Sequence, residues 1–164
     1  MKNFRSFDRV LIALFAVAAI STTLAEVVVW QPCSDEVSVS EQPGCTIHEV
    51  RVNPCREAAQ GKPCRIKRGR NAGITFDYTP NFSSDTLQNR AYWTRPGGDL
   101  PFIGMNLNAC NATVCPSVSG QKQTYSYQLS ISQSFPARTY DVKWKLWNQE
   151  QQECCFVFQI KLYK

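Results

Sequence analysis

Cysteine is the residue type with the widest range of possible chemical roles in this 164-residue sequence, which contains eight cysteines. None is spaced as a Cys-x-x-Cys pair, and the only histidine is His48, so the sequence argues against a zinc or other metal site. All eight cysteines follow residue 25, and an even number after an N-terminal targeting segment is typical of a disulfide framework. They are Cys33, Cys45, Cys55, Cys64, Cys110, Cys115, Cys154 and Cys155.

Residues able to catalyse a reaction are scarce. His48 is next to Glu49 in a predicted strand, so the two side chains are expected on opposite faces. The sequence has no Gly-x-Ser-x-Gly elbow, no P-loop and no His-Glu-x-x-His motif. With every cysteine assigned to a disulfide, no thiol nucleophile remains. We therefore expect no enzyme activity and no cofactor, and interpret His48 as a surface residue.

The most concentrated charge is a basic cluster at residues 65–70, in which Lys67, Arg68 and Arg70 are the candidates for anion binding. They could contact an anionic membrane surface or the phosphates of a bacterial glycolipid. The alternative is a solvated basic turn, which a single cluster of this size favours. The formal net charge of +5 is too small to indicate a nucleic-acid-binding protein.

Residues 1–25 have the pattern of a secretory signal peptide, with basic residues, an apolar run and small residues before Ala25. Its removal takes away three basic residues and one acidic residue, which lowers the net charge from +5 to +3. The remaining 26–164 segment is long enough for one domain with a hydrophobic core. Two glycosylation sequons, at Asn81 and Asn111, fit a secreted, extracellular protein.

Most of the mature segment alternates between apolar and polar residues with a period of two, which predicts half-buried β-strands. Such alternation covers residues 74–78, 87–93, 124–132, 140–146 and 156–162. Residues 26–31 and 47–52 add two further predicted strands, and Pro, Gly and Asn residues separate these segments. The sequence has no helical stripe and no internal repeat. We expect a single all-β sandwich of seven to eight strands.

The mature segment is also rich in aromatic residues, including Trp30, Trp93, Trp144 and Trp147. On strands, aromatic side chains form hydrophobic cores. A filled core and an apolar ligand cavity have the same composition, so the composition leaves both interpretations open.

Several motifs, in order, resemble the ML (lipid-recognition) domain family, particularly the Niemann–Pick type C2 sterol carriers and the group 2 mite allergens. The matching segments extend over nearly the whole mature chain and include six cysteines in the family's order. They are residues 50–55, 62–64, 67–69, 74–76, 101–102, 108–116 and 124–127, with the last strand that follows Cys155.

The resemblance implies an immunoglobulin-like β-sandwich with a hydrophobic cavity between its sheets. It places ligand-contacting positions at Phe102, Ile131 and Phe135, and we assign Tyr127 and Phe76 to the same binding site. It also implies the disulfides Cys33–Cys155, Cys55–Cys64 and Cys110–Cys115. Cys45 and Cys154 remain and are expected to pair, with a vicinal Cys154–Cys155 bridge as the rival assignment.

Two functions follow from the resemblance. The first is a monomeric, secreted protein that holds a sterol or similar lipid and transports it, with the endolysosomal lumen as the alternative location. The second is an innate-immune recognition protein that binds bacterial lipopolysaccharide or other envelope components. The ligand-contacting positions should determine binding in both cases, and Lys67, Arg68 and Arg70 should matter as well in the second.

Overall fold

The computed structural model describes residues 25–33 and 44–164. Almost all of the predicted signal segment, residues 1–24, lies outside this range, as do residues 34–43. The description that follows therefore concerns the predicted mature domain.

The described residues form ten β-strands and two short 3-10 helices. The strands are β1 (Glu26–Val27), β2 (Trp30–Pro32), β3 (Cys45–Asn53), β4 (Cys64–Lys67), β5 (Asn71–Pro80), β6 (Gln88–Trp93), β7 (Leu100–Pro101), β8 (Gln123–Ser130), β9 (Thr139–Trp147) and β10 (Glu153–Tyr163). The 3-10 helices are η1 (Ala58–Gln60) and η2 (Ala109–Asn111).

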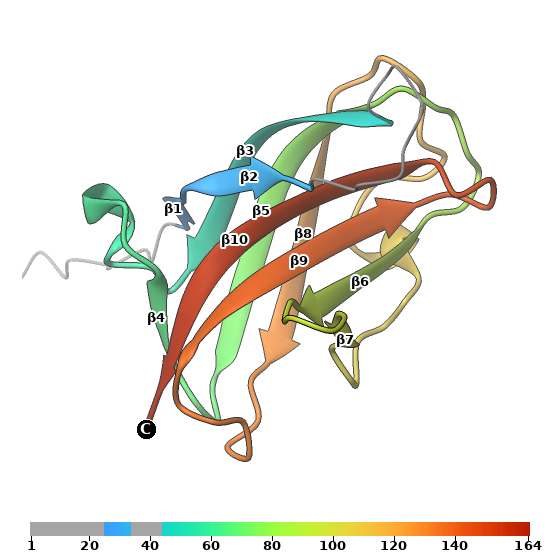
Figure 1. Ribbon diagram of the computed structural model, residues 1–164. Helices are drawn as coiled ribbons and strands as arrows, with labels where there is room; N and C mark the ends of the chain where they lie inside the picture. Colours follow the sequence, from blue (N-terminus) through green and yellow to red (C-terminus); the bar gives the residue numbers. More distant parts are fainter. Residues whose placement is uncertain (1–24, 34–43) are drawn as a thin grey trace, which may run out of the picture.

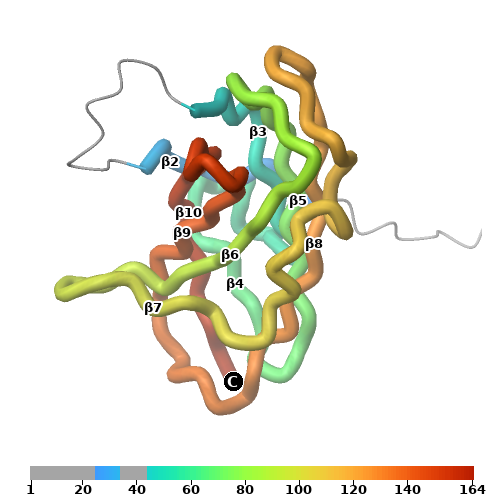
Figure 2. Tube along the Cα trace, turned by 90° about the vertical axis from the view of Figure 1, so that its right-hand side faces the viewer, coloured from blue at the N-terminus to red at the C-terminus, as the bar shows by residue number. Residues whose placement is uncertain are grey.

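The strands form two sheets that pack face to face, which confirms the predicted all-β sandwich (Figure 1). One sheet has four strands in the order β1-β3-β5-β8. The other has six, in the order β2-β10-β9-β6-β7 with β4 beside β10. Figure 2 shows the two layers from the side, with β3, β5 and β8 to the right of β10, β9 and β6.

The predicted alternation is seen in strands of both sheets. In β5, Ile74, Phe76 and Tyr78 are buried between the sheets, whereas Asp77 lies on the outer face. There Asp77 accepts a hydrogen bond from Arg51 of β3, with 2.9 Å between Oδ1 and Nη2. Burial disfavours the charged carboxylate, but hydrogen bonds from Arg51 and other partners outweigh it and lower the pKa of Asp77. The sheet thus has an apolar inner face and a hydrogen-bonded polar outer face.

Three segments differ from the prediction and raise the strand count, and one of them is the two-residue strand β7, which pairs with β6. The single strand expected at residues 26–31 is divided, because β1 pairs with β3 whereas β2 pairs with β10 of the other sheet. Val28, at the crossing point, is buried between them. The basic cluster begins with strand β4, which pairs in parallel with β10 and buries Ile66. Whether such a short segment forms a strand depends more on the strands beside it than on the apolar–polar alternation of its own residues.

Four disulfides link these elements, and they include all eight cysteines. The pairs are Cys33–Cys155, Cys45–Cys154, Cys55–Cys64 and Cys110–Cys115, as the sequence led us to expect. The rival vicinal bridge is not formed. Since Cys45 starts β3 and Cys154 is in β10, their bond connects the two sheets directly.

Residues 25–33 and 44–164 contain no helix that is long and apolar enough to cross a membrane.

Candidate functional site

An apolar cavity lies between the two sheets, and its volume is about 20 Å³. Its walls come from both sheets and are formed mainly by aliphatic and small side chains. They include Val52, Ile66, Ala72, Ile74, Ala91, Leu129, Ile131, Val142, Phe158 and Ile160. A pocket that holds a drug-sized ligand usually has a volume of about 300–1,000 Å³. A lipid can therefore enter only if side chains move apart.

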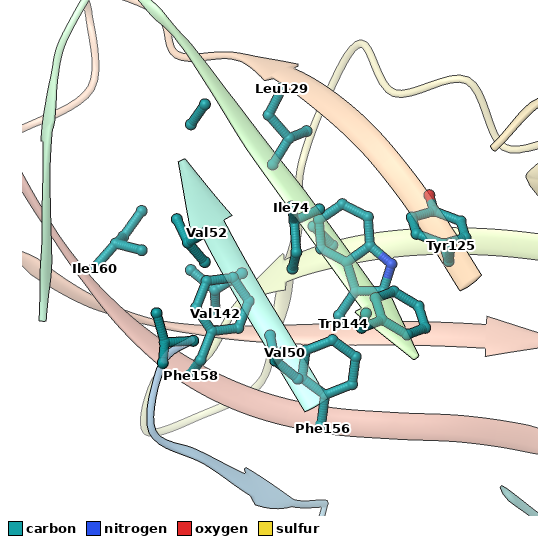
Figure 3. Close-up of a cluster of buried hydrophobic side chains, with 14 of the residues drawn as sticks. Val50, Val52, Ile74, Tyr125, Leu129, Val142, Trp144, Phe156, Phe158 and Ile160 are labelled. Carbon is teal, nitrogen blue, oxygen red and sulfur yellow. The ribbon is translucent and has the colours of Figure 1, made fainter. Parts of the chain in front are cut away.

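Four fully buried aromatic rings lie beyond the cavity, and we call them the deep cluster: Phe76, Tyr125, Trp144 and Phe156. Phe76 stacks on Tyr125 with 4.6 Å between ring centroids and meets Phe156 edge-on at 4.9 Å. Figure 3 shows Tyr125, Trp144 and Phe156 to one side of two aliphatic side chains that line the cavity, Val52 and Ile160. No residue of the deep cluster lines the cavity, and all four are fully buried, so this part of the sandwich is packed core.

Buried polar groups join the deep cluster to its surroundings. The Tyr125 hydroxyl donates a hydrogen bond to Asn89 Oδ1 at 2.6 Å, and Asn89 Nδ2 donates to the backbone carbonyl of Leu107 at 3.1 Å. The Tyr78 hydroxyl donates to Gln123 Oε1 at 2.8 Å. Burial raises the pKa of both tyrosines, so their hydroxyls stay protonated as donors. The deep cluster is thus joined to Asn89 by one directional bond, from Tyr125, whereas Trp144 Nε1 is buried with no hydrogen-bond partner among the described residues.

A second group of rings packs together at the cavity, and we call it the mouth cluster: Trp93, Phe102, Phe135 and Tyr140. Trp93 lies at its centre, with ring centroids 5.4 Å from Phe102, 5.6 Å from Phe135 and 4.6 Å from Tyr140. Phe102 and Trp93 line the cavity, whereas Trp93 and Phe135 are partly exposed to solvent. The cluster is thus the layer that separates the cavity from water.

The backbone next to the mouth cluster comes from two loops. One is the mouth segment, residues 131–136, which follows β8; the other is the basic turn, residues 67–70, which joins β4 to β5. Both lie at the lower end of the sandwich in Figure 1. They are hydrogen-bonded to each other, since Ile131 donates its N–H to the Arg70 carbonyl at 2.9 Å. Arg68 Nη1 also donates to the Phe135 carbonyl, at 2.7 Å.

The structure brings three of the five proposed ligand-contacting residues to the cavity or its mouth. Phe102 and Ile131 line the cavity, with exposed fractions of only 6% and 1%. Phe135 is not a lining residue, but its ring packs on Phe102 with 5.6 Å between centroids. Phe76 belongs to the deep cluster instead. Tyr127 packs beside the deep cluster, and its hydroxyl accepts a hydrogen bond from the Asn106 N–H at 2.8 Å.

Sequence reasoning treated two mouth residues, Trp93 and Tyr140, only as strand residues of the core. Their proximity results from the pairing of β6 with β9, which places Trp93 opposite Val142. A further signal was available, because Ala72 and Ala91 are small residues in otherwise bulky inward-facing rows. Small side chains at such positions leave space between the sheets.

The other candidate residues lie away from the cavity. His48 is exposed on β3, and its Nε2 is 2.8 Å from Thr79 Oγ1. Lys67 and Arg70 of the basic turn are exposed, as are the sequon residues Asn81 and Asn111. Among the described residues, no three His, Cys, Asp or Glu side chains are placed to hold a metal ion together.

Comparison with known proteins adds independent information. A family model described as the ML domain matches residues 27–162. The "MD-2-related lipid-recognition protein" of Manduca sexta is 39% identical over 155 residues, which cover 92% of this chain and 96% of that protein. The mite group 2 allergen Der f 2 of Dermatophagoides farinae is 25% identical over 103 residues, covering 63% of this chain and 68% of the allergen.

Among solved structures, a Niemann–Pick type C2 protein from the Japanese carpenter ant superimposes with a TM-score of 0.69. The match covers 82% of this chain and 99% of the ant protein at 17% sequence identity, so it bears on the fold alone. The family model and the Manduca sexta relative both extend over nearly the whole described domain. The chain therefore belongs to the ML-domain family, whose members are lipid-binding proteins without enzyme activity.

Proposed function

We propose that the protein is a secreted carrier that holds a sterol or similar hydrophobic ligand between its sheets and transports it. The observation that carries this proposal is the apolar cavity, which contacts both sheets and is covered by the mouth cluster. Removal of apolar ligand surface from water supplies about 25 cal/mol per Å². Much of that is offset by association and ordering costs, so we expect micromolar or tighter binding, equivalent to about −8 kcal/mol.

The small cavity volume bears on the size of the ligand. With about 20 Å³ free, the sheets must separate or the mouth rings must turn before a lipid is accommodated. The displacement grows with the volume of the ligand. A compact ligand with one hydrophobic body, such as a sterol, requires the smallest rearrangement, and this favours the carrier function.

A second candidate is recognition of bacterial lipopolysaccharide or a related envelope component. Two observations favour it: the Manduca sexta relative is named a lipid-recognition protein, and the basic turn lies beside the mouth segment. A phosphorylated lipid could place its acyl chains in the cavity and its phosphates near Lys67 and Arg70, which are exposed. It would require a larger opening than a sterol, because it carries several chains.

Lipid extraction of the protein secreted from eukaryotic cells, followed by mass spectrometry, is the most direct test of the ligand class. In parallel, purified protein should be titrated with dehydroergosterol and with lipopolysaccharide. Phe102→Ala should weaken binding of the preferred ligand, whereas a matched substitution far from the cavity, Thr79→Ala, should leave it unchanged. Absence of any co-purified lipid together with no binding of either probe would refute the proposal.

We propose further that transfer involves contact between the basic turn and an anionic membrane surface. Each exposed cation near such a surface contributes about 1 kcal/mol at low salt. The double variant Lys67→Gln/Arg70→Gln should therefore transfer dehydroergosterol more slowly to phosphatidylglycerol vesicles, with unchanged equilibrium binding. Equal transfer rates for variant and wild type across a salt series would show that the basic turn is only a solvated surface element.

Secretion and glycosylation complete the proposal. Residues 1–25 should be removed on export, and Asn81 and Asn111 should carry glycans, since both are exposed and lie in sequons. N-terminal sequencing of protein recovered from culture medium should begin at Glu26. A mass decrease on treatment with peptide-N-glycosidase should disappear in the Asn81→Gln/Asn111→Gln variant.

A further inference from the structure

We infer that Arg68 is a positioning residue that holds Phe135 in the mouth cluster and thereby sets the rate of ligand exchange. The inference rests on the proposed lipid-binding function of the cavity. It separates Arg68 from Lys67 and Arg70, with which the sequence grouped it.

The contacts of Arg68 connect segments that are distant in the sequence. Its Nη1 donates a hydrogen bond to the Phe135 carbonyl at 2.7 Å, across a separation of 67 residues. Its backbone N–H donates to the Tyr163 carbonyl at the end of β10, at 3.0 Å. Arg68 thus ties the mouth segment to the last strand of the six-stranded sheet.

The environment of Arg68 differs from that of its basic neighbours. Lys67 and Arg70 are exposed, whereas Arg68 is only partly accessible. Its Nε is buried and has no hydrogen-bond partner within the described residues. A solvated surface cation would keep its guanidinium in water. Here the guanidinium is held against the mouth segment instead.

The basic turn and the mouth segment are also packed as one unit. The Gly69 N–H donates to the Ile131 carbonyl at 2.6 Å. Gly69 has φ of +75°, and a Cβ at this position would come within 2.8 Å of the Gln133 side chain. The positive φ favours glycine at this position, and the Gln133 side chain of the mouth segment packs directly against it. Arg68 therefore acts on a segment that the turn already contacts.

The position of the Phe135 ring follows from this attachment. Its carbonyl is bound by Arg68, and the next carbonyl, of Pro136, accepts a hydrogen bond from the Tyr140 hydroxyl at 2.9 Å. The ring then contacts Trp93 and Phe102, which line the cavity. A ligand can pass if the Phe135 ring turns or if its backbone shifts, and we infer that the backbone shifts, which breaks the bond from Arg68. Loss of this bond should make opening easier with or without ligand, so rates should change more than affinity.

Stopped-flow exchange of dehydroergosterol tests the inference on the full mature chain. Arg68→Met keeps the length of the side chain but removes its donors, and we expect roughly tenfold faster association and dissociation. The dissociation constant should change less than about twofold, because both rates rise together. Arg68→Lys retains one donor and should restore most of the wild-type rates. Arg56→Met removes the donors of an exposed arginine outside the basic turn, so it is the control and should leave the rates unchanged.

A double-mutant cycle with Phe135→Ala shows whether Arg68 acts through that ring. Phe135→Ala alone should accelerate exchange, and Arg68→Met should add little in that background. Independent, multiplying effects of the two substitutions would contradict the inference, as would wild-type rates in Arg68→Met.

Hydrogen–deuterium exchange of residues 131–136 gives a readout that needs no ligand. Arg68→Met, but not Arg56→Met, should accelerate exchange in this segment. Unchanged exchange would overturn the inference even if the wild-type protein bound no probe. A protein that neither binds a probe nor co-purifies with lipid would refute the proposed function separately. Wild-type binding with no effect of Arg68→Met would refute only the role of Arg68.

Discussion

The deep cluster and the mouth cluster are both groups of four aromatic residues, but they are held in different ways. In the deep cluster, Tyr125 forms a buried hydrogen bond to Asn89, and the nearby Cys45–Cys154 disulfide connects the two sheets. In the mouth cluster, the rings of Trp93, Phe102 and Phe135 contact one another without such bonds among the side chains described. The polar contacts there bind backbone carbonyls of the mouth segment.

This difference indicates which end of the sandwich can open. Ring contacts lose little when one ring slides over another, because dispersion is weakly directional. Buried hydrogen bonds have strict geometry, and an unpaired partner costs free energy. We therefore expect the sheets to stay fixed at the deep cluster while the mouth cluster admits the ligand. The following predictions test this asymmetry, from the largest expected effect on stability to the smallest.

Phe76→Ala should lower the free energy of unfolding by about 3–5 kcal/mol, as is typical of truncating a buried phenylalanine. Phe76 is fully buried and contacts Tyr125 and Phe156, so the change leaves a cavity in packed core. Urea unfolding of wild type and variant measures the loss. A stable variant with weakened lipid binding would instead place Phe76 in the binding site.

Removal of the inter-sheet bridge in Cys45→Ala/Cys154→Ala should cost about 3 kcal/mol. Although Cys45 and Cys154 are 109 residues apart, the Cys33–Cys155 bridge already closes the long loop. The second bridge therefore closes a ring of only about 15 residues through residues 33–45 and 154–155. Unfolding under non-reducing conditions measures this, and a loss near 5 kcal/mol would mean that the bridges act independently.

Tyr125→Phe should cost about 1–3 kcal/mol, because it leaves the buried Asn89 Oδ1 without its donor while the ring packing is kept. Thermal unfolding measures the loss, and lipid affinity should be unchanged. Tyr163→Phe, at a partly exposed ring near the C-terminus, is the control. A neutral result would show that the deep cluster is fixed by packing alone.

Ile131→Ala should cost about 2 kcal/mol or less, at or below the lower end of the usual range for buried isoleucine. Its side chain borders the cavity, so it has fewer neighbouring atoms to lose than a residue in packed core. Dehydroergosterol binding should weaken at the same time. Paired melting and binding curves decide the matter: a large loss of stability with affinity untouched would show that Ile131 is core.

Much of the fold could be predicted because the alternation of apolar and polar residues within a strand indicates both the strand and its buried face. The alternation at residues 74–78 and 156–162 places Phe76 and Phe158 on inner faces, and both are buried there. The division of residues 26–32 between two sheets could not be predicted in this way. That division depends on which edge, β3 or β10, each short segment meets.

The candidate site shows the same limit. Phe102 and Ile131, which the family resemblance assigned to the ligand site, both line the cavity. Phe76 and Ile131 have equivalent positions in the alternating pattern, yet one is in the deep cluster and the other borders the cavity. The hydrogen bond between Arg68 and Phe135 had no sequence signal, since it joins two loops that touch only in the folded chain.

The sequence by itself determined which side chains face inward, because successive residues of a strand point to opposite faces. It also supplied the cysteines and the small residues, such as Ala72 and Ala91, that allow space between the sheets. Only the tertiary structure decided how this space is distributed. At each point between the sheets, the free space depends on the summed volumes of the side chains that both sheets contribute there. The pairing of the strands decides which residues, far apart in the chain, meet at that point.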